Sequence, residues 1–194
     1  NRADDTFGWG VVFSNETLGN FKDADEPSIT RITESFAHWE AIDTYVGGRV
    51  LRSGGHGFSG IARRRLLQIL QERCTELGVR LKFQTEMDAL PTADVVVAAD
   101  GINSKVRTAH EDVFQPTIEP GKARFIWLGT TRRFEAFTFI IRDTDHGLFQ
   151  VHAYPFELAS RPSGPERNTS TFIVETDPET WRRAGLDTAS IDES

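Results

Sequence analysis

One string of fifteen residues, Ala93 to Arg107, limits what this 194-residue chain can fold into more than any other. It opens with Ala-Asp-Val-Val-Val-Ala-Ala, an almost wholly apolar run that is typical of a strand buried on both faces. Asp100 and Gly101 follow at the carboxyl end of that strand, where α/β sheets bind ligands. Asp-Gly after a strand is by itself a common turn, so only the whole string is specific. It predicts a layered α/β fold with a ligand site at this turn.

The residue types at this turn suit a nucleotide. Asp100 can accept hydrogen bonds from ribose hydroxyls, and Gly101 lets a ligand pass close to the backbone. Ser104 and Arg107 lie one helical turn apart, where they can shape the turn or meet a phosphate.

Helices and strands alternate in the first half of the chain. A glycine-rich turn within residues 6–13 runs into a short strand, and a polar stretch up to Pro27 is expected to be a loop. Ser28 is the expected cap of a helix with apolar residues at spacings of three and four, Ile29, Ile32, Phe36 and Trp39. Strands are expected within 44–59 and at 79–83. Between them we expect a helix over about 61–77, with Leu66, Leu67, Leu70, Cys74 and Leu77 on one side and Gly78 as its cap.

After about Pro116 the sequence becomes rich in β-strand patterns. Four runs are separated by turn residues, and they predict an antiparallel sheet: Phe125–Thr131, Phe137–Ile141, Leu148–Tyr154 and Thr169–Thr176. Asp177 and Pro178 then predict the start of a helix. We therefore expect two domains, over residues 1–115 and 116–194.

Composition excludes several classes of function. The net charge of −7 and the absence of a Lys/Arg stripe argue against nucleic acid as a partner, and no apolar run is long enough to span a membrane. The single cysteine, Cys74, excludes an internal disulfide and favours a cytoplasmic protein. The five histidines lack metal-ligand spacing, so no bound metal is expected.

The string from Asp100 to Arg107 resembles the Asp-Gly fingerprint of flavin-dependent aromatic hydroxylases of the p-hydroxybenzoate hydroxylase type. In that family the fingerprint serves both FAD and NAD(P)H. Residues 60–66 are similar to the family's helix start, where an arginine reaches the FAD ribose and pyrophosphate, and the matching residue is Arg63. On its own, Arg63 would be interpreted as a solvated arginine on a helix surface. The resemblance implies a partial Rossmann-like FAD-binding domain followed by a β-sheet substrate domain.

Further motifs, in the family's order, are similar to one subgroup. It contains salicylyl-CoA hydroxylases, aminobenzoyl-CoA monooxygenases and the hydroxylase of violacein synthesis. The motifs are Thr6–Phe13, Arg52–Phe58, Phe125–Thr130, Val151–Tyr154 and Ser170–Glu175. This resemblance covers nearly the whole chain.

The resemblance also suggests roles for individual residues. Gly8, Trp9 and Gly10 would pass near the isoalloxazine. His56 or His152 would assist deprotonation of the substrate, and Trp127, His152 and Tyr154 would contact it, although a histidine on a strand is more often a core residue. A CoA thioester needs basic residues for its phosphates, for which the candidates are Arg132, Arg133 and Arg161.

The implied activity is NAD(P)H-consuming hydroxylation of an aromatic ring by a flavin hydroperoxide. The expected substrate is an aromatic acyl-CoA such as salicylyl- or aminobenzoyl-CoA, and a tryptophan-derived indolic compound is the first alternative. A related halogenase or double-bond reductase is a second alternative, although no lysine of the chain has the surroundings that halogenases need. A non-catalytic domain that kept the flavoprotein fold is the third.

Two departures from the family pattern concern the ends of the chain. No Gly-x-Gly-x-x-Gly turn precedes Asn1, and no Gly-Asp segment for the flavin pyrophosphate occurs before Ser194. The chain also starts without an initiator Met. We therefore expect an internal fragment of a longer enzyme, inactive alone and unable to hold FAD tightly.

Overall fold

The computed structural model describes residues 3, 6, 8–87, 89–157 and 169–189. The chain forms two compact units: one combines residues 1–81 with 122–194, and the other is Lys82–Gly121. The expected domains, 1–115 and 116–194, stay a prediction, and the compact units divide the chain at other positions. The predicted class, α/β with a further β-sheet, is confirmed.

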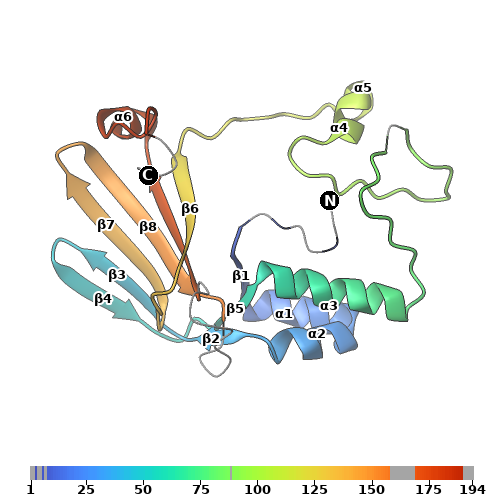
Figure 1. Cartoon of the computed structure of the whole chain (residues 1–194), viewed down its shortest axis with the longest axis horizontal. Helices are drawn as coiled ribbons and strands as arrows, with labels where there is room; N and C mark the ends of the chain where they lie inside the picture. The colour runs from blue at the N-terminus through green and yellow to red at the C-terminus, as the bar shows by residue number, and fades with distance from the viewer. Residues whose placement is uncertain (1–2, 4–5, 7, 88, 158–168, 190–194) are drawn as a thin grey trace. The chain divides into compact units, whose positions relative to one another are not determined.

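A three-stranded antiparallel sheet and three helices form one layer of the larger unit (Figure 1). The strands, in spatial order, are β1 (Gly10–Ser14), β5 (Phe58–Ala62) and β2 (Ala37–Trp39). The helices are α1 (Asn15–Ala24), α2 (Glu26–Thr33) and α3 (Arg63–Glu76). Apolar side chains of these elements make one buried cluster, Phe13, Ile29, Ile32, Phe36, Ile61 and Ile69.

The first two helices correct the sequence prediction. α1 occupies the stretch expected to be a loop, and it begins where the Ser14 hydroxyl accepts a hydrogen bond from Thr17 N at 3.3 Å. Asp25, rather than Ser28, caps α2, because its Oδ2 accepts from Ser28 N at 3.1 Å. α2 also ends at Thr33, so the expected Phe36 and Trp39 lie beyond it. Pro27 in the first turn favours this earlier start.

α3 agrees with its prediction. The helix begins at Arg63, directly after β5, and Gly78 beyond its end has the expected left-handed φ of +73°. Within α3 the side chain of Ile69 is fully buried, whereas that of the next residue, Leu70, is 39% exposed.

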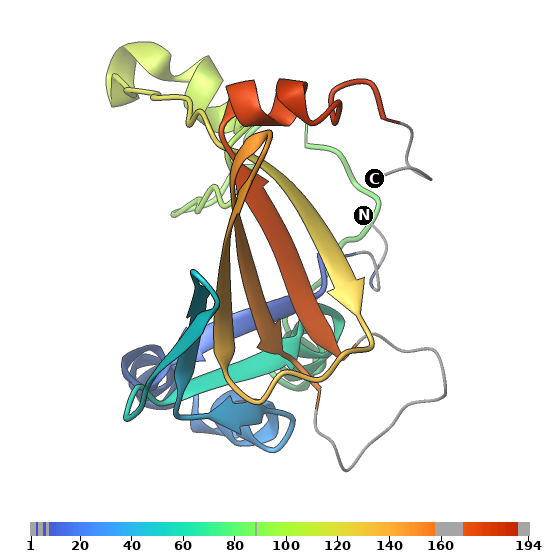
Figure 2. The ribbon, with the colours of Figure 1, turned by 90° about the vertical axis from the view of Figure 1, so that its left-hand side faces the viewer.

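A six-stranded sheet forms the second layer of the larger unit, seen from the side of β3 and β4 in Figure 2. Its order is β4-β3-β7-β8-β9-β6, antiparallel except for the parallel pair β3–β7. The strands are β3 (Ile42–Val46), β4 (Arg49–Ser53), β6 (Arg124–Thr130), β7 (Phe137–Thr144), β8 (Gly147–Pro155) and β9 (Ser170–Thr176). The four predicted β-rich runs are therefore confirmed, and α6 (Pro178–Arg183) starts at Asp177 as expected.

The smaller unit contains α4 (Lys105–Ala109) and α5 (Glu111–Phe114). The strands predicted at 79–83 and 93–99 were wrong for this structure, because residues 79–104 form no strand where they are described. Val95 and Val97 are 78% and 83% exposed. A strand needs a neighbour for its N–H and C=O groups, and no described segment pairs with this one.

No helix among the described residues has the length and apolar character needed to cross a membrane.

Charged side chains join the helices of the larger unit. Arg73 of α3 donates to both carboxylate oxygens of Asp25, with Nη2 2.9 Å from Oδ1 and Nε 3.0 Å from Oδ2. Glu76 bonds Arg31 of α2 and Arg73. The hydrogen bond from Arg73 lowers the pKa of Asp25 to about 2. The folded state thus favours the ionised Asp25.

Since the pKa of Asp25 is lower in the folded protein than its ordinary value, its contribution to stability is present above pH 4 and is lost between pH 4 and 2. The Asp25→Asn variant keeps the helix cap and loses the charge, so its urea midpoint should fall less than that of wild type between pH 6 and pH 3. Asp23→Asn, at an exposed position of α1, is the control and should follow wild type. If the urea midpoint falls equally with pH in Asp25→Asn and in wild type, the expectation is contradicted.

Candidate active site

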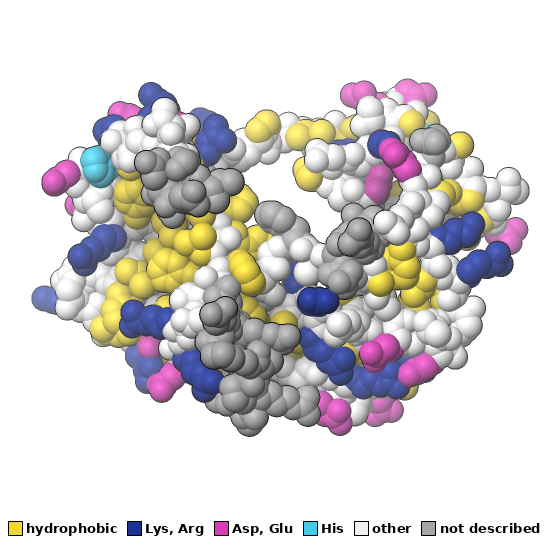
Figure 3. Space-filling view, in the orientation of Figure 1, with side chains coloured by type: hydrophobic (Ala, Val, Ile, Leu, Met, Phe, Trp, Pro, Cys, Tyr) yellow, Lys and Arg dark blue, Asp and Glu magenta, His cyan; other side chains and the backbone are white. Residues whose placement is uncertain are grey.

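One face of the six-stranded sheet gathers aromatic side chains. Trp127, Ile173, His152 and Phe139 are register partners across β6, β9, β8 and β7. Alternate residues of a strand share a face, so Tyr154 and Phe137 lie on it as well. We call this the aromatic face: Trp127, Phe137, Phe139, His152 and Tyr154. In Figure 3, apolar side chains also cover much of the molecule's surface over the six-stranded sheet.

Tyr154 connects the aromatic face to the smaller sheet. Its ring stacks on Phe137 and Trp39, with centroids 5.3 and 6.3 Å away, and its buried hydroxyl donates to the carbonyl of Gly10 at 3.2 Å. Burial raises the pKa of Tyr154, and the positive charge of Arg63 acts in the opposite direction. Arg63 therefore acts electrostatically on this tyrosine.

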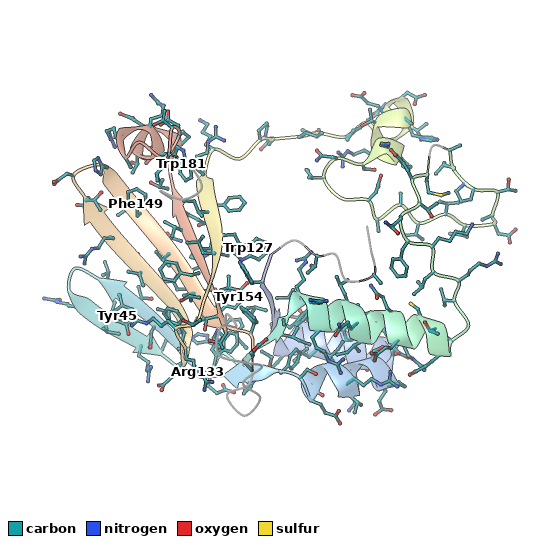
Figure 4. All side chains as sticks on the ribbon, viewed as in Figure 1. Tyr45, Trp127, Arg133, Phe149, Tyr154 and Trp181 are labelled. Atoms are coloured by element: carbon teal, nitrogen blue, oxygen red, sulfur yellow. The ribbon has the colours of Figure 1, made fainter. Side chains whose placement is uncertain are left out.

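The segment leading into β1 lies against the same site. Arg63 N donates to the carbonyl of Trp9 at 2.9 Å. Gly8 has a φ of +85°, and a Cβ there would lie 2.5 Å from Cη2 of Trp127. Figure 4 shows Trp127 projecting from β6 toward this segment. A Cβ on Gly10 would lie 2.7 Å from Cβ of Phe156, so both positions exclude side chains.

His152 has polar neighbours on an otherwise apolar face. Its Nε2 lies 2.5 Å from Nε2 of Gln150 and 3.6 Å from Oε2 of Glu175. The edge of its ring meets Phe139, with centroids 4.9 Å apart and planes at 78°. Its side chain is 25% exposed. This imidazole can exchange a proton with solvent or ligand while an acidic group stays in reach.

His56 reaches the aromatic face indirectly. Its Nε2 bonds the Ser53 hydroxyl at 2.8 Å, and its ring stacks on Phe58 with centroids 6.1 Å apart. Phe58 in turn packs on Phe137. In the described part of the chain no hydrogen bond or ring contact joins His56 to His152, and His56 is exposed, so the geometry favours His152 over His56 as a proton acceptor.

In the smaller unit, four predicted cofactor residues lie together at one turn. Asp100 accepts from Lys105 N at 3.0 Å, and its hydrogen bond with Ser104 is the main cause that lowers its pKa. Gly101 has a φ of +82°, and the Ser104 hydroxyl caps α4 by accepting from Arg107 N at 3.0 Å. The Arg107 guanidinium donates to the carbonyls of Gly101 and Ile102. These side chains thus hold the turn in shape.

A pocket adjoins this turn within the smaller unit. Its walls combine the four turn residues with apolar side chains, namely Leu90, Val96, Val97, Ala98, Asp100, Gly101, Ser104, Val106, Arg107, His110, Phe114 and Pro116. The combination of an apolar wall with a few polar groups suits an organic ligand.

Some site residues were not predicted from the sequence. Gln150 is two positions before His152 and thus on the same face of β8, which was a usable signal. The position of Glu175 near His152 results from the pairing of β8 with β9, which the sequence does not reveal. Among the basic candidates, Arg132 lies over the ring of Phe134 and Arg133 is exposed. Arg161 lies outside the described residues.

In the part of the chain that the structure describes, no three His, Cys, Asp or Glu side chains form a group that could hold a metal ion.

Sequence comparison finds relatives over nearly the whole chain. A Streptomyces salicyloyl-CoA 5-hydroxylase is 45% identical over 191 residues, covering 96% of this chain and 35% of the relative. The 3-hydroxy-4-methyl-anthranilyl-[aryl-carrier protein] 5-monooxygenase of Streptosporangium sibiricum is 32% identical, covering 89% and 47%. The protodeoxyviolaceinate monooxygenase of Chromobacterium violaceum is 30% identical, covering 96% and 49%. The chain thus spans between a third and a half of these relatives, and no family model matches it.

Solved structures share the fold. PqsL of Pseudomonas aeruginosa, crystallised with 2-aminobenzoylacetate, superposes with a TM-score of 0.68 at 14% identity, covering 93% of this chain and 53% of PqsL. The tetrameric 2-methyl-3-hydroxypyridine-5-carboxylic acid oxygenase gives 0.67 at 16% identity, covering 90% and 49%.

The close approach of Gly8 to Trp127 yields a prediction. Gly8→Ala adds a Cβ into the indole and occupies a left-handed φ, so it should lower the free energy of unfolding by about 1–3 kcal/mol. Gly19→Ala is the control: it lies in α1 with open space around it and should be neutral or stabilising. Urea unfolding followed by tryptophan fluorescence measures both, and equal midpoints for the two variants would refute the contact.

Proposed function

Because this chain is homologous to a segment of the FAD-dependent aromatic monooxygenases, we propose that it supplies the substrate-binding sheet and part of the flavin site of such an enzyme. The reaction is hydroxylation of an aromatic ring with consumption of NAD(P)H. Residues 1–115 form part of the FAD-binding domain and residues 116–194 part of the substrate domain, in a cytoplasmic enzyme.

One observation carries the proposal: the aromatic face adjoins residues 8–10, at the start of β1, and the backbone of Arg63. The Tyr154 hydroxyl donates to the Gly10 carbonyl, Trp127 lies on Gly8, and the backbone N–H of Arg63 donates to the Trp9 carbonyl. Offset or edge-on aromatic pairs contribute about 0.5–1.5 kcal/mol beyond burial, so such a face suits a planar aromatic ring. The substrate ring would then lie beside the segment assigned to the flavin.

The residues present fit FAD. The guanidinium of Arg63 has no hydrogen-bond partner among the described residues, which suits a pyrophosphate or ribose oxygen. Asp100 uses part of its hydrogen-bonding capacity within its own turn, and a carboxylate has lone pairs left for ribose hydroxyls. Reduced by NAD(P)H, the bound flavin supplies the oxygen-activating chemistry.

The chain's own side chains then have three tasks. Trp127, Phe139 and Tyr154 orient the ring and keep water away from it. His152 accepts a proton from the substrate at its imidazole. Glycines at positions 8 and 10 keep the backbone free of side chains where the flavin approaches.

The proposed substrate is an aromatic acyl thioester. Two of the three relatives are named for substrates carried on CoA or on an aryl-carrier protein. Arg133 is exposed and has no ion-pair partner among the described residues, so it is a candidate for a phosphate of the carrier. The violacein-pathway relative supports an indolic substrate as the alternative.

A parallel assay tests this function. The complete gene product is incubated with FAD, NADH or NADPH, and one of three substrates: salicylyl-CoA, aminobenzoyl-CoA or an indolic compound. We expect hydroxylated product from a CoA thioester, detected by mass spectrometry with one added oxygen. Product from the indolic compound alone favours the alternative substrate. A protein that binds no flavin and forms no product is a non-catalytic domain.

The flavin assignment has a separate test. Arg63→Ala should weaken FAD binding by about 10- to 150-fold, since a charged hydrogen bond contributes about 1.5–3 kcal/mol. Arg65→Ala removes another arginine of α3, which contacts Ser35, and should leave the affinity unchanged. Titration of the complete gene product, freed of flavin, with FAD measures the dissociation constants of both variants. Equal affinities for Arg63→Ala and Arg65→Ala would remove Arg63 from the site.

A further inference from the structure

Glu175 lies in a place where it can control the proton chemistry of His152. We propose that Glu175 is a positioning residue that, together with Gln150, holds Nε2 of His152, so that Nδ1 accepts the proton of a ring hydroxyl in a phenolic substrate. This inference rests on the proposed function and narrows its substrate class to phenols.

Strand pairing brings these groups together. Gln150 and Glu175 are direct register partners on β8 and β9, and His152 follows Gln150 on the same face of β8. The Nε2 atom of His152 lies 2.5 Å from the Gln150 amide nitrogen and 3.6 Å from Glu175 Oε2. Two elements of regular structure therefore fix the arrangement, with no loop involved.

The two ring nitrogens of His152 have different environments. Nε2 meets Gln150 and Glu175, while Nδ1 has no hydrogen-bond partner among the residues that the structure describes. The partner of one imidazole nitrogen determines whether the other is free to accept a proton. An Nε2–H directed at the carboxylate leaves a lone pair on Nδ1. The Gln150 amide can bond Nε2 whether or not Nε2 carries a proton, because a turn of the amide presents either its oxygen as acceptor or its N–H as donor.

The proton step is balanced. The O–H bond of the phenol breaks, its electron pair stays on the oxygen as phenolate, and an N–H bond forms at Nδ1. The imidazole becomes a cation, and the carboxylate of Glu175 compensates its charge at ion-pair distance. A phenolate ring is richer in electrons than a phenol, which favours attack on an electrophilic oxygen.

The surroundings of His152 contain few other charges. Phe139 and Phe137 face it from β7, and Ile173 separates it from Trp127 on the β9 side. Tyr154, two positions along β8, is the nearest other titratable group on the face. Burial raises the pKa of Tyr154, so it stays neutral in the working range. Glu175 is therefore the charged partner of His152 within the described part of the chain.

The test uses the complete gene product with salicylyl-CoA, which has a ring hydroxyl, and aminobenzoyl-CoA, which has none. His152→Gln should lower kcat for salicylyl-CoA about 100-fold, as expected for loss of a general base. Glu175→Gln keeps the shape and removes the charge. It should lower kcat about tenfold and move the acid limb of the kcat–pH profile toward lower pH, because the carboxylate that compensates the imidazolium charge is gone. With aminobenzoyl-CoA, both losses should be less than threefold.

Two controls separate positioning from a structural role. Glu135→Gln removes an exposed carboxylate before β7 and should leave kcat and the profile unchanged. The double variant His152→Gln/Glu175→Gln should be no slower than His152→Gln alone, because Glu175 acts through the imidazole. Additive losses in the double variant, or an unshifted profile in Glu175→Gln, would overturn the inference.

An NMR titration tests the interaction of Glu175 with His152 independently of hydroxylation. The His152 imidazole signal, identified by its loss in His152→Gln, is titrated by NMR in wild type and in Glu175→Gln. A lower midpoint in Glu175→Gln than in wild type supports the interaction of Glu175 with His152 even when no hydroxylation is found, and the missing product would then count against the proposed function alone. An unchanged midpoint contradicts this interaction. A Glu175→Gln variant that fails to fold is replaced by Glu175→Asp, for which a partial shift is expected.

Discussion

The contact between Tyr154 and Gly10, the first residue of β1, is the constraint on which the rest of the site depends. A single hydrogen bond from the Tyr154 hydroxyl to Gly10 contributes only about 0.5–1.5 kcal/mol. The stack of Trp39, Tyr154 and Phe137 adds about as much for each aromatic pair and buries far more apolar surface. Packing therefore holds the two sheets together, and the hydrogen bond sets where the backbone of β1 lies against β8.

Local patterns in the sequence predicted those parts that local physics determines. Alternating apolar residues placed β6 to β9 within a few positions, and Asp177 and Gly78 marked helix ends correctly. His152 and Tyr154 could be assigned to one face because they are two residues apart on a strand. The grouping of His152 with Trp127 could not, since it depends on the order in which β6, β9 and β8 pair.

Two errors have a common physical origin. The apolar run 93–99 was expected to be a buried strand, yet an isolated strand leaves its backbone groups unpaired, and its formation depends on a neighbour rather than on its own composition. α1 was expected to be a loop because its residues are polar. Its helix instead begins at the Ser14 cap, and Phe21 packs edge-on against Phe13. In both segments tertiary context outweighed composition.

The Asp100 turn owes its shape to its own polar side chains. Its polar groups bond one another: Ser104 caps α4, Lys105 N donates to Asp100, and Arg107 donates to the carbonyls at 101 and 102. These bonds hold the turn beside its pocket, and no strand among the described residues of this unit takes part, so a ligand of this turn would meet a backbone that is already organised. A preorganised turn loses less conformational entropy when it meets its ligand, and that saving appears as affinity. The side chains that hold the local fold are thus the same ones that the proposed cofactor site would use.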